Sequence, residues 1–219
     1  KILNAKDYGI PQNRERVFIV SIRKDIDSGK FKFPEKVTGE LSVMNFLDNE
    51  VDKDYYVNDY FIQQIKNTKY RNNDSHKENT LLIANFKYDN FAIMDYRYDE
   101  GLRIRKNNLC PTLTTRGKQS ISGVPIIYNK KTLRFITPKE CWRLMGFSDT
   151  DYEKVQNIIT IPQLYKQAGN SIVVDVLYYI YKELYIVIPE IFDDLKLSSF
   201  FSGIGAFEKA LDKFYTELS

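Results

Sequence analysis

The spacing of apolar and polar residues along the first third of the chain predicts short elements joined by polar connections. A turn at residues 8–11 leads through a polar stretch to a β-type apolar run at residues 17–22. Residues 42–49 and 58–67 have the apolar spacing of short amphipathic helices. The polar segment at residues 66–79 predicts a loop.

The second half of the chain predicts a short capped helix and a longer one. Thr137, Pro138 and Glu140 combine a hydroxyl N-cap, a proline at the first helical position and a capping-box acid, so we expect a helix to begin there. Residues 168–171 predict a tight turn directly before a long helix, whose apolar stripe lies within residues 173–184. Free amides at such a helix start can hold a carboxylate or a phosphate, although taken alone the pattern is an ordinary N-cap.

A third pattern closes the sequence. An apolar run at residues 195–201, a Ser-Gly-Ile-Gly turn at residues 202–205 and a helix-like segment at residues 206–214 read as strand, glycine turn and helix. This order is typical of the opening of a nucleotide-type cofactor site. Because few residues follow, we expect the other strands of its sheet to come from elsewhere.

Composition narrows the class of protein. The 219 residues suit one domain, or one domain with a small appendage, and a net charge of +3 is too small to indicate a polyanionic partner by itself. Two cysteines, Cys110 and Cys141, and no apolar leader predict a cytoplasmic protein of a bacterial or phage-like kind. We expect no membrane span and no metal site, since the lone His76 lies in a polar loop and Cys141 lies among apolar neighbours as an inert thiol.

Two clusters of arginines modify this picture. Arg14 and Arg16 share one parity of an extended segment, so both guanidinium groups are predicted to point at one site. The alternative is a solvated strand entry. A second cluster flanks the threonine-rich residues 111–115 and suits a grip on a phosphate backbone, while an ordinary charged β-edge explains it equally well. Its members are Arg97, Arg103, Arg105, Lys106, Arg116 and Lys118.

Five blocks of the chain together resemble the DNA (cytosine-5)-methyltransferase family. The resemblance rests on all five blocks together, because a single Gly-x-Gly motif would not identify the family. The blocks are "YGIPQNRERVFIV", similar to the eighth motif of the family, "RKNNLCPTLTTRG", similar to the ninth, "ITPKECWRLMGF", similar to the segment after it, "YKQAGNSIVVDVLYYI", similar to the tenth, and "LSSFFSGIGAFEKAL", similar to the first.

The resemblance implies an α/β fold with the S-adenosyl-methionine-dependent methyltransferase (Rossmann-like) sheet, incomplete in this chain, and a small target-recognition domain. The chain then divides into a catalytic-domain strand region at residues 1–30, a target-recognition region at residues 31–100, a return to the catalytic domain at residues 101–185, a linker at residues 186–194, and a cofactor-binding strand-turn-helix at residues 195–219.

The order of the motifs departs from the family's order, because the first motif comes last. The first and tenth motifs of the family meet around the cofactor, so a short linker can join them, which is the usual geometric condition for circular permutation. Fusion of two neighbouring genes is the alternative, and we favour permutation because no Met begins the closing segment.

The family's nucleophilic Pro-Cys-Gln string and its Glu-Asn-Val string are absent from the sequence. Cys110 is followed by proline and Cys141 by tryptophan, so neither matches the nucleophile. The resemblance therefore implies double-stranded DNA with a flipped cytosine as substrate, and a complementing polypeptide or continuation that carries motifs two to six. A restriction-modification system is the setting that it implies.

The resemblance also assigns roles to individual residues. Arg16 would contact the flipped cytosine, Arg14 would hold the active-site loop or a phosphate, and Gln12 would support that loop. The residues implied to bind S-adenosyl-methionine are Phe201, Gly203, Ile204, Gly205, Asn170 and Ser171. The residues implied to bind DNA are Arg97, Arg103, Arg105, Thr115 and Arg116.

Two other classes of protein stay open. One is a non-catalytic DNA-binding or regulatory homologue, or a subunit of a split methyltransferase, which would differ by the presence or absence of a co-purifying Pro-Cys-Gln chain. The other is a fragment of a dinucleotide-binding oxidoreductase, suggested only by "FSGIGAF". That class predicts an acidic residue about 20 positions further on, which the sequence does not reach, and leaves the other four blocks unexplained.

Overall fold

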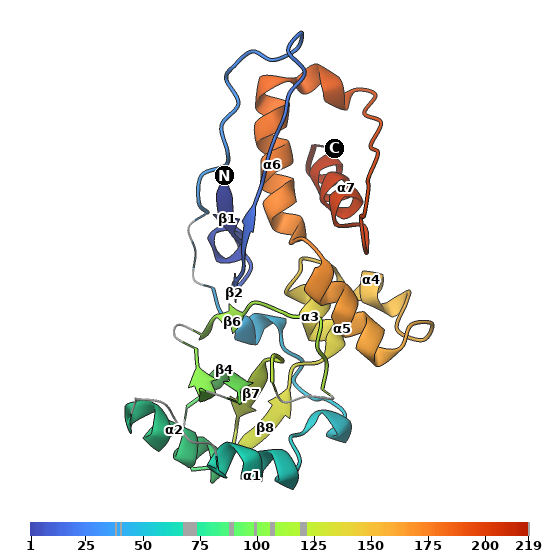
Figure 1. Cartoon of the computed structure of the whole chain (residues 1–219). Helices are drawn as coiled ribbons and strands as arrows, with labels where there is room; N and C mark the ends of the chain where they lie inside the picture. The colour runs from blue at the N-terminus through green and yellow to red at the C-terminus, as the bar shows by residue number, and fades with distance from the viewer. Residues whose placement is uncertain are drawn as a thin grey trace.

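A sheet with two helices lies at one end of the molecule, and the two chain termini lie at the other end on either side of a long helix (Figure 1). Shorter helices lie between the sheet and the termini. The computed structural model describes residues 1–37, 39, 41–67, 74–87, 90–98, 100–105, 108–118 and 122–218.

The sheet at the lower end of Figure 1 has four antiparallel strands. Their spatial order is β5 (Gly101–Ile104), β4 (Ala92–Arg97), β7 (Ile126–Asn129) and β8 (Thr132–Phe135). Ile93 lies opposite Ile127 in this register, and both side chains are buried. The helices α1 (Asp59–Asn67) and α2 (Asp74–Ala84) accompany the sheet. This unit, the recognition sheet, takes α1, α2 and β4 from the predicted target-recognition region at residues 31–100. Its strands β5, β7 and β8 come from residues 101–185, which were predicted to return to the catalytic domain.

The first predicted elements are confirmed in part. Residues 42–49 contain a 3-10 helix, Val43–Phe46, and residues 58–67 form α1. The polar loop predicted at residues 66–79 is wrong at its end, because α2 begins at Asp74 and places His76 in a helix. Residues 68–73 of that loop, and Lys106 of the second arginine cluster, lie outside the described residues.

Two small ladders lie nearer the termini. The strand β1 (Ile2–Asn4) pairs antiparallel with β3 (Glu15–Val17), and β2 (Gln12–Asn13) pairs parallel with β6 (Cys110–Pro111). The strand predicted at residues 17–22 is therefore wrong beyond its first residue. Val17 pairs with Ile2. The Phe18 N–H then donates to the Lys1 carbonyl, and the ladder ends with this bond.

The capped helix is confirmed as α3 (Pro138–Arg143). The Thr137 hydroxyl accepts from the Glu140 N–H at 3.2 Å, and the Glu140 carboxylate accepts from the Thr137 N–H at 2.7 Å. Two further helices follow, α4 (Asp149–Glu153) and α5 (Ile161–Asn170). The local sequence alone determines this helix start, because both partners of the cap lie within four residues.

The turn predicted at residues 168–171 is wrong. Residues 168–170 form the last turn of α5, and the Ser171 N–H donates back to Gln167 and Ala168. The long helix, α6 (Val174–Val187), begins three residues later with Val173 as its N-cap. Asn170 and Ser171 therefore lie at a helix C-terminus, where carbonyl groups rather than free amides collect.

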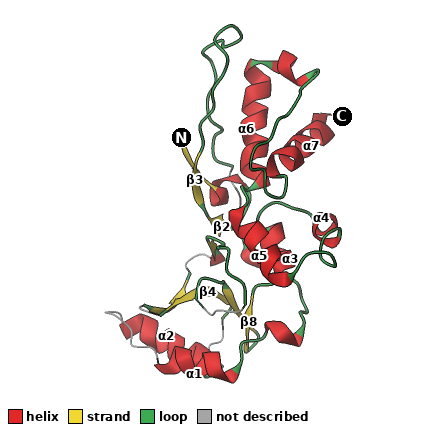
Figure 2. Cartoon of the chain, turned by 45° about the vertical axis from the view of Figure 1, so that its right-hand side comes forward, coloured by secondary structure: helices red, strands yellow, loops and turns green. Residues whose placement is uncertain are grey.

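The closing segment forms the predicted helix without the predicted strand. The helix is α7 (Ala206–Leu218), which packs against α6 (Figure 2). Its buried Phe214 ring contacts the rings of Tyr185 and Phe192. Residues 195–201 have no strand, because no neighbouring strand in the described structure supplies the backbone partners that a strand needs.

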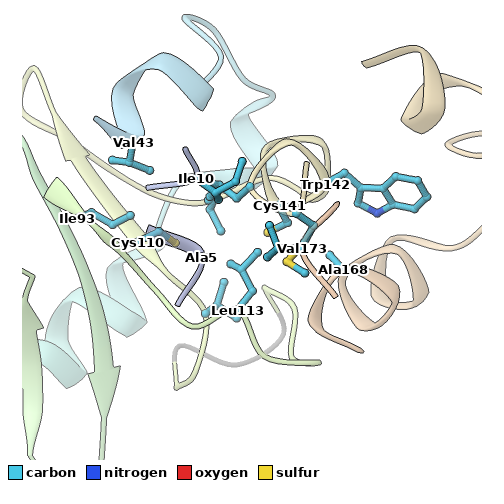
Figure 3. Packing of buried hydrophobic residues seen from close by; sticks show 14 of the residues in the cluster. Ala5, Ile10, Val43, Ile93, Cys110, Leu113, Cys141, Trp142, Ala168 and Val173 are labelled. Atoms are coloured by element: carbon cyan, nitrogen blue, oxygen red, sulfur yellow. The ribbon is translucent and has the colours of Figure 1, made fainter. Parts of the chain in front are cut away.

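The core between the ladders and the helices joins the two ends of the molecule (Figure 3). Leu113, Cys141, Ala168 and Val173 meet there, with Cys110 close by. The buried position of Cys141 confirms the predicted core thiol. Among the helices that the structure describes, none is long and apolar enough to cross a membrane.

Candidate functional site

A cleft of about 1060 Å³ lies between the recognition sheet and the β2–β6 ladder. Five cations and a single acid are the charged residues of its lining, and we call it the basic cleft. Its cations are Lys6, Arg97, Arg103, Arg105 and Arg116. One acid, Asp95, accompanies them. The structure therefore brings together four of the five residues predicted to bind DNA.

Asp95 divides the arginines of the basic cleft into two kinds. Its nearly buried carboxylate pairs with both Arg103 and Arg105 across the β4–β5 hairpin. Burial alone would lower the pKa of Arg103, but the hydrogen bonds and charges of Asp95 and Glu100 together raise that pKa. Arg97 is half-exposed beside Glu100, with 3.6 Å between nitrogen and oxygen, and Arg116 is exposed. Two arginines are thus held in place, and two are more free to move.

The threonines beside the cleft are partly committed to internal bonds. The Thr112 hydroxyl donates to the Asn13 carbonyl, and the Thr114 hydroxyl donates to the Gly123 carbonyl, each at 2.6 Å. Thr115 is exposed. The hydroxyl bonds hold the backbone that carries Thr115 and Arg116 at the edge of the cleft.

Arg14 and Arg16 do not point at one site, so that prediction is wrong. The Arg14 side chain is buried and donates to the carbonyls of Leu113 at 3.0 Å, Gly169 at 2.8 Å and Ser171 at 2.8 Å. Arg16 is exposed and donates to its neighbour's carbonyl. The two residues separate because β2 and β3 pair with different partners on either side of Arg14.

Burial makes Arg14 chemically unusual. Desolvation, with a smaller contribution from the charge of Arg16, lowers the pKa of Arg14 to about 10. The three carbonyls replace part of the water that the guanidinium loses, since they bond to its two terminal nitrogens while its buried Nε has no hydrogen-bond partner among the described residues. Arg14 therefore clamps three chain segments together.

Gln12, which lies in β2 two residues before Arg14, completes this clamp. Its side-chain amide donates to the Leu144 carbonyl at 2.8 Å, and its side-chain oxygen accepts from the Leu113 N–H at 3.1 Å. The side chain is fully buried. Gln12 thus fixes the end of α3 to the segment that follows β6.

Gly169 is required by a close backbone approach. A Cβ at this position would overlap the Thr114 carbonyl and lie 2.7 Å from the Thr115 N–H. We expect Gly169→Ala to lower the free energy of unfolding by about 2 kcal/mol, because a methyl group must displace backbone rather than a flexible side chain. Urea denaturation measures the change. Gly39→Ala is the control, since its Cβ meets nothing within 4 Å, and equal values for the two variants would contradict the close approach.

The glycine turn near the C-terminus has part of the predicted geometry. Gly203 and Gly205 have φ angles of 62° and 77°, and the Gly205 N–H donates to the Ser202 carbonyl at 3.1 Å. Phe201 is fully exposed, and Ile204 is half-buried at the start of α7. The turn leads into a helix N-terminus as a nucleotide-type site requires, but the strand before it is missing.

Neither cysteine is suited to nucleophilic chemistry. Cys110 and Cys141 are buried, and desolvation raises the pKa of both thiols. A thiol with a raised pKa holds little thiolate at neutral pH. Within the described ranges, the structure contains no group of three or more His, Cys, Asp or Glu side chains placed to hold a metal ion.

Two structural residues of the site were missed. Asp95 has no local sequence signal, because its arginine partners lie on the next strand. Arg134 forms a buried ion pair with Glu140 at 2.8 Å, which the capping box did not indicate. The sequence did hold a signal for this pair. Arg134 is a charged residue at an otherwise apolar strand end, and a charge that is buried in such a place needs a partner of opposite charge.

Comparison with known proteins places this geometry in context. The family model described as C-5 cytosine-specific DNA methylase matches residues 1–185. The type II methyltransferase M2.ScrFI of Lactococcus lactis subsp. cremoris is 35% identical over 184 residues, which cover 84% of this chain and 44% of that protein. The type II methyltransferase M.HhaI of Haemophilus parahaemolyticus is 32% identical, with coverages of 82% and 50%. The chain thus spans about half the length of these relatives.

Two solved structures resemble the fold. The Entamoeba histolytica methyltransferase EhMeth has a TM-score of 0.52 and 19% identity, covering 90% of this chain and 53% of that chain. The S. pombe Dnmt2 methyltransferase has a TM-score of 0.50 and 21% identity, with coverages of 85% and 56%. At these identities the likeness establishes the methyltransferase fold.

Proposed function

This chain belongs to the C-5 cytosine-specific DNA methylase family, and from that premise we propose that it supplies the DNA-recognition half of a DNA (cytosine-5)-methyltransferase. The complete enzyme transfers a methyl group from S-adenosyl-methionine to carbon 5 of a cytosine. The chain contributes DNA contacts and part of the cofactor site, and a second segment contributes the nucleophile.

The basic cleft is the observation that carries this proposal. Five cations and one carboxylate line a single concave surface, although the net charge of the whole chain is only +3. A cleft with this charge attracts a phosphate backbone, and each neutralised phosphate releases counterions, so binding weakens as salt rises. Arg97 and Arg116 suit phosphate contacts because they retain freedom, whereas Asp95 holds Arg103 and Arg105 in fixed orientations.

The exposure of the Arg16, Arg14 and Gln12 side chains indicates the role that each would have in the reaction. Arg16 is exposed and free to contact a flipped cytosine, while the clamp geometry makes Arg14 and Gln12 positioning residues rather than ligands of substrate. Neither buried cysteine replaces the missing Pro-Cys-Gln nucleophile. The thiolate that attacks carbon 6 of cytosine therefore comes from the second segment.

S-adenosyl-methionine fits the glycine turn only in part. A Cβ at Gly203 would meet no atom within 4 Å, so the turn has an open face, and exposed Phe201 lies beside it. Gly203, Ile204 and Gly205 would hold the cofactor from this side, with Asn170 and Ser171 at its methionine end. The cofactor supplies the electrophilic methyl group when bound.

We further propose that the first motif is circularly permuted to the end of this chain. The family match stops at residue 185, two residues before α6 ends, and α7, which begins at Ala206 beyond the proposed linker at residues 186–194, packs back on α6. The Tyr181 hydroxyl reaches the Phe207 carbonyl at 3.5 Å, and Lys213 pairs with Asp175 at 2.5 Å. These contacts support a short connection between the tenth and first motifs.

The alternative is a DNA-binding homologue without catalysis, which the same cleft would serve. A transfer assay with labelled S-adenosyl-methionine and duplex DNA separates the two, together with the intact mass of the material purified from its host. Our proposal predicts no transfer by the 219-residue chain alone and transfer by material that contains a Pro-Cys-Gln segment. Methyl transfer by the chain alone would contradict the proposal that the chain lacks the nucleophile. No transfer with that segment present would favour the DNA-binding homologue without catalysis.

Arg116→Ala tests the phosphate role directly. We expect the slope of log binding constant against log salt concentration to become shallower by about 1, because one phosphate contact is lost. Fluorescence anisotropy with a labelled duplex measures it. Arg23→Ala is the matched control, since Arg23 is exposed and pairs with Asp25 outside the cleft lining. Equal slopes for the two variants would show that Arg116 does not contact a DNA phosphate.

A further inference from the structure

Two arginines of the basic cleft lie on one face of β5 and the residue that follows it. Arg103 is opposite Asp95 in the register of the recognition sheet, and the Arg105 N–H extends the pairing by donating to the Ile93 carbonyl at 2.8 Å. Side chains two positions apart in an extended segment point to the same face. Asp95 is therefore the direct cross-strand neighbour of Arg103 and the diagonal neighbour of Arg105, and its carboxylate meets both.

Asp95 is an unexpected residue in a cleft that attracts phosphate. It is only 7% exposed, and its negative charge weakens the attraction of the cleft for a polyanion. A phosphate contact carries no sequence information and needs only a cation, such as Arg97 or Arg116. Asp95 instead supplies orientation, because a carboxylate that meets two planar guanidinium groups fixes the directions in which their remaining N–H groups point.

The two guanidinium groups differ in the donors that they have left. Arg103 uses both terminal nitrogens on carboxylates, Nη2 on Asp95 and Nη1 on Glu100 at 2.7 Å. Arg105 meets Asp95 through Nη2, and its Nη1 makes no hydrogen bond to a described residue. Because the Arg105 side chain is 32% exposed while its Nε is buried, its accessible nitrogens are the terminal ones. Arg105 thus presents an oriented pair of N–H donors to the cleft.

We propose that Arg105 reads a guanine of the DNA target and that Asp95 is the residue that positions it. This inference rests on the proposed function and deepens it, because it names one base that the basic cleft recognises. Guanine has two adjacent acceptors, O6 and N7, on its major-groove edge. The fork of an arginine matches them with two parallel hydrogen bonds.

The other three bases do not match this arrangement. Adenine places an amino donor beside its N7 acceptor, and thymine has one acceptor beside a methyl group, so neither accepts both donors of Arg105. Cytosine offers an amino donor that a carboxylate can accept, but both oxygens of Asp95 already meet arginines. Arg105 therefore discriminates between bases, whereas Arg97 and Arg116 supply affinity without discrimination.

Selection from a pool of duplexes with a randomised central segment tests this assignment. The 219-residue chain is mixed with the pool, and the bound duplexes are recovered and sequenced. We expect a position at which guanine is enriched about tenfold over each other base. Arg105→Lys keeps the charge beside Asp95 but replaces the fork with a point charge, so we expect the enrichment at that position to be lost and the enrichment at other positions to be kept.

Arg97→Lys is the matched control. Arg97 lines the same cleft, and a lysine also binds phosphate, so we expect the base preference to be unchanged at every position. A pool without an enriched guanine, or equal losses of enrichment in Arg105→Lys and Arg97→Lys, would overturn the base contact. DNA binding with a steep salt dependence would then still support the proposed function. If the chain bound no duplex of the pool, both would be overturned.

Asp95→Asn tests the positioning role. The substitution keeps the volume of the side chain and removes the charge that orients both arginines. We expect the guanine enrichment to fall to about twofold, and the affinity for a duplex of A·T pairs alone to rise at least twofold, because the cleft loses a negative charge. A residue that only supported the fold would lower both quantities, and that result would overturn the positioning role of Asp95.

Discussion

Replacing Arg14 with methionine is expected to lower the free energy of unfolding by about 3 kcal/mol. The substitution leaves the buried carbonyls of Leu113, Gly169 and Ser171 without their shared donor, and buried acceptors that lose a charged partner carry the full cost of desolvation. Methionine fills a similar volume, so the loss reports the hydrogen bonds rather than a cavity.

Urea denaturation of the chain measures this change. Arg23→Met is the control, because the Arg23 side chain is 75% exposed and its partner Asp25 is a surface acid, so we expect less than about 0.5 kcal/mol. A loss below 1 kcal/mol in Arg14→Met would contradict the clamp. That result would favour a role for Arg14 in contacting the substrate.

Glu140→Gln is expected to cost about 4 kcal/mol, the larger of the two effects. The Glu140 carboxylate is fully buried and accepts four hydrogen bonds, two from Arg134, one from Thr137 and one from the Asp48 N–H. An amide replaces one acceptor oxygen with a donor and removes the only charge that the structure shows paired with Arg134 among the described residues. A buried guanidinium without a partner charge is strongly unfavourable.

This ion pair also joins β8 of the recognition sheet to α3. We therefore expect Glu140→Gln to weaken DNA binding as well, because the sheet carries Arg97, Arg103 and Arg105 of the basic cleft. Glu153→Gln is the control, since Glu153 is about half exposed and meets Lys139 at 3.4 Å. Similar urea midpoints for the two variants would show that the buried pair contributes little.

Elements that depend on neighbouring residues were predictable from the sequence. The capping box of α3 is complete within residues 137–140, and α1 has an apolar spacing that its own residues determine. The family blocks were also recognisable, because the matched residues 1–185 include four of them.

Features that depend on distant residues were not predictable. The segment at residues 168–171 can end a helix or precede one, and the approach of Gly169 to Thr114 favours the first. Arg14 and Arg16 have the same parity, but different strand partners separate them. The strand predicted at residues 195–201 needs a neighbouring strand that the described structure lacks.

The charge of the basic cleft was predictable only as a cluster in the sequence. The sequence places Arg97, Arg103 and Arg105 near one another, but it does not show that Asp95 holds two of them. Nor does it show that Lys6, from near the N-terminus, lines the same cleft. Folding alone brings these groups onto one concave surface.

The salt dependence of DNA binding tests the central claim most directly. Fluorescence anisotropy at several salt concentrations compares the chain with a variant in which Arg97, Arg103, Arg105 and Arg116 are all alanine. The account predicts that the unsubstituted chain binds duplex DNA with a steep dependence on salt, and that the slope for the variant is shallower by about 2, because the phosphate contacts of Arg97 and Arg116 are both lost. Equal slopes and equal affinities for the two proteins would contradict the assignment of the basic cleft as the DNA-binding surface.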